Sequence, residues 1–387
     1  MSVSPSNLAE AQSRLFGHPL ELAVVVPTFK ERGNVEPLLA LLEAALQGVE
    51  YEVIFVDDDS PDQTAALIRR IASGSPRVRV LQRIGRRGLA SACIEGMLAT
   101  PARYIAVMDA DLQHDERVLP RMLELLKRDQ LDLVIGSRNV AGGSMGEFAR
   151  KRVLLSGLGA RLSRMVCHCT LSDPMSGFFI VDRRFFEEVV HRLSALGFKI
   201  LVDLVSSCRR PVRFGEVPYE FRSRQSGESK LDLNVGIEYI SLLIDKLIGD
   251  VIPVRFVLFG FVGALGLFVH LATLGLLTFQ GGIGFVRAQA AATFVAMTFN
   301  FLLNNIVTFR DRRLRGWNIV PGLLSYYIAC SLGALANVSL AKLLITSGFP
   351  WYVAGACGMI VSSVWNYGVN TIFTWRRGRV KLSGNFG

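Results

Sequence analysis

Paired cysteines are missing from this chain. Its six cysteines include no Cys-x-x-Cys pair, and the isolated Cys167-His168-Cys169 group offers fewer than the four ligands that structural zinc takes. We therefore predict free thiols in a reducing compartment. Residues 1–20 also lack the apolar core of a secretory signal, so we expect a polar lead-in and no export of residues 21–250.

Acidic residues are scarce in the second part of the chain. Residues 251–387 contain eleven Lys or Arg and a single acid, Asp311, so the whole net charge of +10 lies there and residues 1–250 are neutral. A basic balance confined to an apolar region gives no indication of nucleic-acid binding, and we expect no nucleic-acid partner.

Four apolar stretches in the basic region are long enough to cross a bilayer, which takes about 20 residues. They cover residues 255–279, 288–309, 320–346 and 351–375. Three tryptophans flank these spans as interfacial anchors would, namely Trp317, Trp351 and Trp375. We predict a multi-pass membrane domain of four transmembrane helices over residues 253–376, followed by a basic tail over residues 377–387.

The arginines predict the orientation of this domain. Nine of the eleven basic residues fall on one side of the predicted spans, and an excess of Lys and Arg marks the cytoplasmic side. They are Arg255, Arg310, Arg312, Arg313, Arg315, Arg376, Arg377, Arg379 and Lys381. The first part of the chain precedes the spans without an export signal, so we predict that it and the C-terminus are both cytoplasmic.

The membrane region contains an internal repeat. "FNFLLNNIVTFR" (299–310) matches "WNYGVNTIFTWR" (365–376) in phase, which indicates a duplicated helical hairpin. We expect the repeated asparagines to connect helices, with a role at lipid headgroups as the alternative. Ahead of the spans, residues 231–252 have one apolar helical face and are too polar to cross, which predicts an interfacial helix.

Residues 22–138 alternate short β-branched runs with amphipathic segments. The predicted strands are 22–29, 51–58, 78–82, 104–111 and 131–137. Their continuous hydrophobicity is typical of a parallel sheet that helices cover on both faces. Such open α/β sheets bind ligands at the carboxyl ends of their strands. In this chain the carboxyl ends of four predicted strands carry polar or turn-forming residues, which predicts a ligand site at that edge.

Asp109 and Asp111 stand at the end of one of these strands. Carboxylates this close repel each other unless a positive charge lies between them, and Gln113 adds a neutral oxygen. Few protein oxygens with open positions suit Mg²⁺ or Mn²⁺ shared with a diphosphate. The alternative is a polar loop in which Asp115 caps the next helix.

Seven motifs occur in order over residues 20–250: "VVVPTFKERGNV", "VDDDSPDQT", "VMDADLQHD", "GSR", "DPMSGFF", "GFKIL" and "SGESK". Together they resemble the family 2 glycosyltransferases, specifically the dolichyl- or polyprenyl-phosphate mannose synthases. The membrane region, with "VRFVLFGFVG", is similar to the GtrA-like four-helix domain of some members. The resemblance implies an α/β GT-A (Rossmann-like) catalytic domain over residues 21–230, followed by the all-α membrane domain.

The resemblance also implies roles for the residues at matching positions. The nucleotide sugar would contact Pro27, Thr28, Phe29, Glu31, Asp58, Asp109 and Asp111. The metal would be held by Asp109, Asp111 and Gln113. The acceptor phosphate would contact Arg138, Arg152, Ser156, Arg224 and Lys230. The catalytic residues would be Asp111, Arg138 and Arg224. Lys30 replaces the usual asparagine of the first motif, which leaves the base contact at that position open.

The implied reaction is the inverting transfer of mannose from GDP-mannose to a polyprenyl (dolichyl-type) phosphate at the cytoplasmic membrane face, with Mg²⁺ or Mn²⁺. The same reaction with UDP-glucose or another UDP-sugar is one alternative. A non-enzymatic lipid-linked-sugar flippase or anchor is the alternative of another class. A processive polysaccharide synthase is disfavoured, because no Q-x-x-R-W motif occurs. Self-association through the transmembrane helices into a homo-oligomer is a further expectation.

Overall fold

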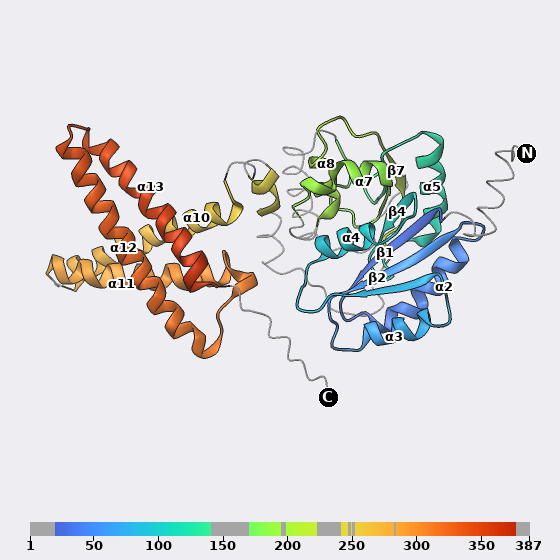
Figure 1. Ribbon diagram of the computed structural model, residues 1–387, viewed down its shortest axis with the longest axis horizontal. Coiled ribbons are helices and arrows are strands. Elements are labelled where there is room, and N and C mark those ends of the chain that lie inside the picture. The colour runs from blue at the N-terminus through green and yellow to red at the C-terminus, as the bar shows by residue number, and fades with distance from the viewer. Residues whose placement is uncertain are drawn as a thin grey trace, which may run out of the picture. The chain divides into compact units, whose positions relative to one another are not determined.

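The computed structural model describes residues 20–140, 170–194, 199–222, 241–246, 249, 252–281 and 284–376. The chain divides into two compact units, Met1–Leu247 and Ile248–Gly387. The first unit is the α/β domain and the second is helical (Figure 1). The five segments drawn from the sequence stay predictions.

The α/β domain is built on one seven-stranded sheet of order β3-β2-β1-β4-β6-β5-β7. Its strands are β1 (Leu22–Thr28), β2 (Tyr51–Asp57), β3 (Val78–Gln82), β4 (Tyr104–Val107), β5 (Leu133–Ser137), β6 (Phe179–Asp182) and β7 (Phe214–Pro218). The five predicted strands are all present. The parallel pairing holds between β1 and its neighbours β2 and β4, while β6, which was not predicted, runs antiparallel to β4 and β5.

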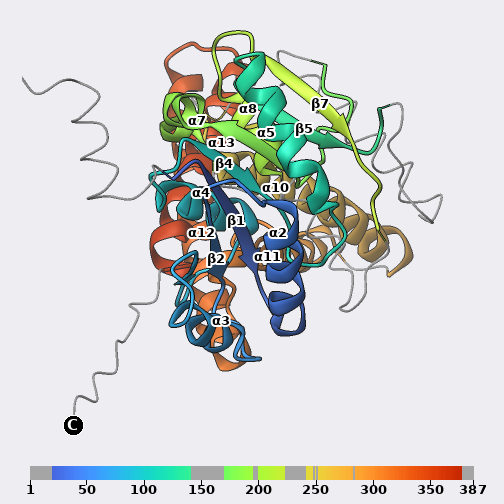
Figure 2. The same cartoon turned by 90° about the vertical axis from the view of Figure 1, so that its right-hand side faces the viewer.

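Helices cover both faces of the sheet, as the hydrophobic strands predict. They are α2 (Val35–Ala45), α3 (Thr64–Ala72), α4 (Leu89–Leu98), α5 (Leu119–Arg128), α7 (Arg183–Val189) and α8 (Ile200–Ser206), with short 3-10 turns η1 (Arg32–Asn34), η2 (Glu116–Val118) and η3 (Val190–Arg192). One apolar cluster joins α2, α3 and α5 to the sheet, and a second joins α4, α7 and α8. In Figure 2, α2 and α4 flank β1 on opposite sides.

The predicted interfacial helix is described only in part. Residues 241–246 are helical, and Leu242 and Leu243 are buried in the cluster on the α8 face. The ammonium of Lys246 lies 2.6 Å from the buried carboxylate of Asp203 in α8. This stretch therefore packs on protein, and a membrane contact of the remainder of residues 231–252 stays a prediction.

The helical unit contains a helix at each predicted span. The helices are α10 (Val254–Gly275), α11 (Phe285–Ile306), α12 (Ile319–Thr346) and α13 (Trp351–Val369), with π-helical ends η4 (Leu276–Gln280) and η7 (Asn370–Thr374) and 3-10 turns η5 (Arg310–Arg312) and η6 (Gly316–Asn318). Three stretches of the described chain are long and apolar enough to cross a membrane: Val254–Phe279, Phe285–Ile306 and Gly316–Thr346. That α13 also crosses stays a prediction.

The structure supports the internal repeat. Helix α10 packs along α11, and α12 packs along α13, which gives two consecutive hairpins (Figure 1). At equivalent positions, Thr308 donates to the side-chain oxygen of Asn304 and Thr374 to that of Asn370, both at 2.7 Å. These hydrogen bonds join residues four positions apart where α11 and η7 end, so Asn304 and Asn370 help to shape these ends.

Trp375 differs from its prediction. It was expected at the membrane interface, but its side chain is fully buried, and its ring stacks on Phe309 at 4.2 Å and 7°. Its indole N–H donates to Asn305 at 3.0 Å. Phe309 and Trp375 occupy equivalent places in the two repeats, so this stack joins the two hairpins. The prediction of an interfacial anchor was wrong because the Trp375 ring packs in the aromatic core between the repeats. Trp317 and Trp351 are largely exposed.

Gly266 provides a test of the first hairpin. A Cβ at this position of α10 would lie 2.1 Å from Oδ1 of Asn300 in α11, closer than packed atoms can approach. We expect Gly266→Ala to destabilise the hairpin by about 1–3 kcal/mol, the usual cost of overpacking. Thermal unfolding of the full chain in detergent measures this.

Gly263→Ala is the matched control, because a Cβ there meets no atom within 4 Å. This change should leave the melting temperature unchanged or raise it, since alanine favours helix by about 1 kcal/mol over glycine. Equal melting temperatures for the two variants would contradict the Gly266–Asn300 contact.

Candidate active site

The polar strand ends meet at one edge of the sheet. Strands β1, β2, β4 and β5 point the same way, because β6 between β4 and β5 is antiparallel to both. Their carboxyl ends carry Thr28, Asp57, Asp109 and Ser137 at or just after the last residue. This edge is where open α/β sheets bind ligands.

At the end of β2, Asp57 and Asp58 are engaged by the protein itself. Asp57 is fully buried and accepts from the hydroxyls of Thr28 (3.3 Å) and Ser60 (2.6 Å). Asp58 lies 2.9 Å from the buried guanidinium of Arg83 and accepts from the N–H of Gly88 at 2.8 Å. Burial raises the pKa of Asp58, an effect that Gly88 and Arg83 oppose. A contact of Asp58 with a nucleotide stays a prediction.

The residues directly after β1 are partly or fully exposed at Phe29, Lys30 and Glu31. The ring of Phe29 has the guanidinium of Arg87 at 4.3 Å from its centroid and the ammonium of Lys30 at 5.7 Å. Lys30 adopts a left-handed backbone, φ 60°, and its N–H donates to Ser60 at 3.0 Å. Glu31 accepts from the side chain of Asn34 at 2.8 Å. Pro27 pairs with Val56 within the sheet.

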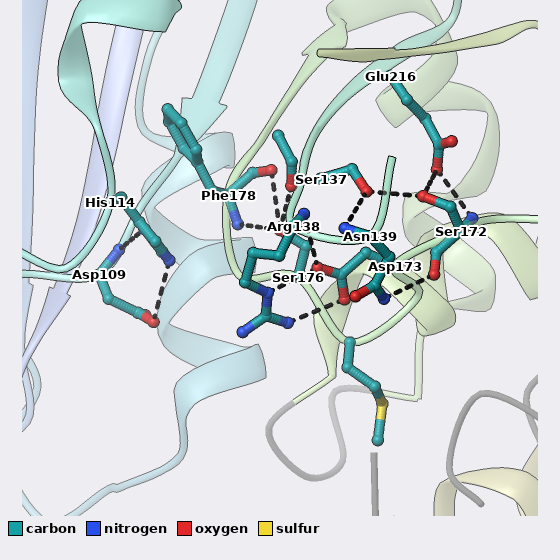
Figure 3. A network of polar contacts seen from close by, with 12 residues as sticks. Asp109, His114, Ser137, Arg138, Asn139, Ser172, Asp173, Ser176, Phe178 and Glu216 are labelled. Carbon is teal, nitrogen blue, oxygen red and sulfur yellow. Dashed lines mark hydrogen bonds and ion pairs between the residues drawn. The ribbon is translucent and has the colours of Figure 1, made fainter. Parts of the chain in front are cut away.

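Asp109 is positioned by two contacts. Its backbone N–H donates to Nδ1 of His114 at 3.3 Å, and its carboxylate lies 3.9 Å from Nε2 of the same ring (Figure 3). A Cβ on Gly177 would lie 3.1 Å from Oδ2 of Asp109, so the glycine lets the 173–177 loop pack directly on the carboxylate. Burial lowers the pKa of His114 to about 4, so the imidazole is neutral near pH 7.

Asp111 and Gln113 lie in the same loop. Gln113 donates its backbone N–H to Asp111 at 3.2 Å and its amide N–H to the carbonyl of Arg222 at 3.0 Å. The Arg222 N–H returns a hydrogen bond to the Gln113 carbonyl at 2.9 Å. Because the amide nitrogen of Gln113 donates to Arg222, the side-chain oxygen is the group of Gln113 that can bind a ligand.

These residues fit a hard divalent cation. No group of three or more His, Cys, Asp or Glu that could hold a metal occurs in the described ranges. Two carboxylates and an amide oxygen are instead the partial set expected for Mg²⁺ or Mn²⁺ that also binds a diphosphate. Asp115 does cap the following η2, with its carboxylate accepting from Arg117 N–H at 3.2 Å, so capping and the proposed metal site use different aspartates.

Arg138 forms a buried ion pair that the sequence did not predict. Its Nε and Nη2 donate to the two oxygens of Asp173 at 2.7 and 2.8 Å, and its backbone N–H donates to the same carboxylate at 3.3 Å (Figure 3). Asp173 is 1% exposed. The guanidinium also lies 5.1 Å from the Phe221 ring centroid. The pair holds Arg138 in one orientation at the end of β5.

The other predicted acceptor-binding residues, Arg152, Ser156, Arg224 and Lys230, lie outside the described residues. The described chain on either side of residues 141–169 is anchored at the site. Ser137 and Ser172 share a 2.6 Å hydroxyl contact, and Asn139 donates to the carbonyl of Ser172 at 2.9 Å (Figure 3). Arg222, two residues before Arg224, is held by Glu116 at 2.8 Å and by Gln113.

Three residues of the site were not assigned from sequence. Asp173 and Lys199 lie within the motifs "DPMSGFF" and "GFKIL", but a motif does not show which side chain pairs with which. His114 is buried, stacks on Phe178 at 5.0 Å and accepts a hydrogen bond from the backbone N–H of Asp109.

The open, mostly parallel sheet, with an Asp-x-Asp loop and a fixed arginine at its strand ends, agrees with the GT-A-like fold that the sequence motifs predict. The chain matches the family model described as glycosyl transferase family 2 over residues 23–190, and the model described as the GtrA/DPMS transmembrane domain over residues 258–375.

Relatives agree with these matches. A dolichol-phosphate mannosyltransferase of Pyrococcus furiosus is 34% identical over 358 residues, which covers 92% of this chain and 99% of the relative. One of Saccharomyces cerevisiae is 34% identical over 233 residues, covering 58% of this chain and 86% of the relative. A glucosyl-3-phosphoglycerate synthase structure from Mycobacterium tuberculosis, with Mn²⁺, UDP and phosphoglyceric acid, has a TM-score of 0.45 and 19% identity over 64% of this chain and 83% of that chain.

The chain belongs to glycosyl transferase family 2 and carries a GtrA/DPMS transmembrane domain. It is therefore a membrane glycosyltransferase.

Proposed function

We propose that the protein transfers mannose from GDP-mannose to a polyprenyl (dolichyl-type) phosphate. The observation that carries this proposal is the 34% identity to a dolichol-phosphate mannosyltransferase over 99% of that relative's length. The acceptor is a phosphate monoester, whose second pKa is near 6, so it is a nucleophilic dianion at neutral pH. Such a nucleophile needs no general base.

The site agrees with a mechanism that has no general base. His114 is neutral and buried, and its Nδ1 already accepts from Asp109, so it is poorly placed to take a proton. An oxygen of the acceptor phosphate would form a bond to C1 of mannose while the bond from C1 to the GDP oxygen breaks. The electron pair leaves with the diphosphate, and direct attack inverts the anomeric centre.

Two sets of residues would stabilise the two charged groups, the diphosphate of the donor and the phosphate of the acceptor. Asp109, Asp111 and Gln113 would hold Mg²⁺ or Mn²⁺, which supplies positive charge to a departing diphosphate when bound. Arg138, kept in place by Asp173, would contact the incoming phosphate. The motif positions of Arg152, Ser156, Arg224 and Lys230 assign these residues to the same phosphate. Fixed cations of this kind stabilise charge without reorganising during the reaction.

We further propose that the reaction occurs at the cytoplasmic membrane face. The basic residues cluster on one side of the spans, which favours a cytoplasmic catalytic domain and C-terminus. The membrane helices would hold the site where the acceptor's phosphate lies in the bilayer.

Transfer of label tests this function. Membranes containing the protein are incubated with a short polyprenyl phosphate, a divalent metal and either GDP-[¹⁴C]mannose or UDP-[¹⁴C]glucose, and label is counted in the organic phase. We expect label from GDP-mannose, and none with the Asp111→Ala variant. Label from UDP-glucose alone would show that the donor is UDP-glucose and not GDP-mannose. No label from either donor with folded protein would overturn the proposal.

A further inference from the structure

Lys199 is a partly buried cation beside the site without a described role. It directly precedes α8, and its ammonium donates to the carbonyl of Met175 at 3.2 Å. Met175 lies in the loop between Asp173, the partner of Arg138, and Gly177, which packs on Asp109. Lys199 therefore donates a hydrogen bond to the loop that contacts both Arg138 and Asp109.

The ammonium has no carboxylate partner among the described residues. No carboxylate there lies within ion-pair distance of Lys199, whereas Lys246 lies 2.6 Å from Asp203. Burial and the charge of Arg138 lower the pKa of Lys199, and the charges of Asp109 and Asp173 oppose this. An enclosed lysine is normally paired, so an unpaired one suggests that its counter-charge comes from a ligand.

The charge balance shows which ligand is needed. Arg138 and Asp173 form a bidentate pair and together carry no net charge. Asp109 and Asp111 suit a divalent cation, which leaves nothing on their side to balance a second anion. Of the cations that the structure describes around this loop, Lys199 alone has no carboxylate within ion-pair distance.

We propose that the ammonium of Lys199 binds the phosphate monoester of the acceptor and supplies the net positive charge that the Arg138–Asp173 pair lacks. Two of its three N–H donors are not used by Met175 and can reach phosphate oxygens. This inference rests on the proposed function, because that function places the acceptor phosphate at Arg138. The residue acts as a ligand-binding group that orients the nucleophile.

Binding measurements test the inference without requiring turnover. Full-length protein in detergent is titrated with geranyl phosphate, and separately with GDP in the presence of MgCl₂. We expect Lys199→Met to weaken geranyl phosphate binding by about tenfold or more, the usual size of a lost charged hydrogen bond. GDP binding should stay within about twofold, and Lys199→Arg should recover part of the loss.

Lys246→Met is the matched control. This variant loses a lysine that has a buried carboxylate partner, so the melting temperature of the protein should fall while geranyl phosphate binding stays unchanged. Lys199→Met should instead keep or raise the melting temperature, because an unpaired buried charge is removed.

Two results would overturn the inference. One is unchanged geranyl phosphate affinity in Lys199→Met. The other is a selective loss of GDP binding, which would assign the ammonium to the donor's diphosphate. Failure of the proposed function is seen separately, as the absence of label transfer by the unaltered protein.

Discussion

Replacing Asp111 with asparagine is expected to lower kcat for sugar transfer by about a thousandfold. The change keeps the size of the side chain and an oxygen that can accept from the Gln113 N–H, but it removes one of the two charges available to a divalent cation. Loss of a group that stabilises developing charge typically costs several kcal/mol, and each 1.4 kcal/mol is tenfold in rate. Label transfer at saturating donor and acceptor measures the effect.

The loss should come from charge and not from unfolding. Asp129→Asn serves as the control, since Asp129 lies at the exposed end of α5 and, within the described part of the chain, pairs with its neighbour Arg128 alone. This variant should transfer label as the unaltered protein does. Chelation of divalent cations by EDTA should reproduce the loss in the unaltered protein. An Asp111→Asn variant with more than a third of normal activity would remove Asp111 from the proposed metal site.

The second large effect is expected at Asp173. Asp173→Ala leaves the Arg138 guanidinium without its bidentate partner, and breaking a buried ion pair usually costs about 3–5 kcal/mol. In a domain of this size that loss lowers the melting temperature by roughly 10 °C. Thermal unfolding followed in detergent gives the shift, and sugar transfer should fall with it because Arg138 is no longer held in position.

A double variant separates stability from binding. Arg138→Leu with Asp173→Leu removes both charges, and replacing a buried pair by apolar residues is often neutral or stabilising. We expect this protein to be more stable than Asp173→Ala and still inactive, since Arg138 is lost. A double variant no more stable than Asp173→Ala would show that the pair is not the cause of the destabilisation.

The parts of the fold that could be predicted from sequence are those that leave a hydrophobic pattern within a short stretch of the chain. The five short apolar runs formed strands whose ends lie within a few residues of the predicted ones, because side chains buried on both faces leave a continuous hydrophobic pattern. Strand β6 was missed because its four residues, Phe179–Asp182, come after a loop rich in small residues and give no periodic pattern. Its antiparallel direction depends on pairing with β4 and β5, which no local pattern encodes.

The site shows the same division. The Asp-x-Asp loop was predictable from two like charges after a buried strand. The partner of Arg138 was not, because Asp173 lies 35 residues away and reaches the strand end only in the folded domain. Trp375 was predicted as an anchor from its place at a helix end, yet it packs on Phe309, which is distant in sequence and equivalent in the repeat.

The repeat of hairpins has a consequence for how such membrane domains can evolve. A hairpin is an even number of crossings, so it returns the chain to the side from which it set out. Adding or deleting a whole hairpin therefore changes the number of helices without inverting whatever is attached at either end. With all four helices crossing as predicted, the second hairpin, α12–α13, is an addition of this kind beside α10–α11. It would enlarge the membrane anchor while preserving parity, so the predicted side of the catalytic domain would stay the same.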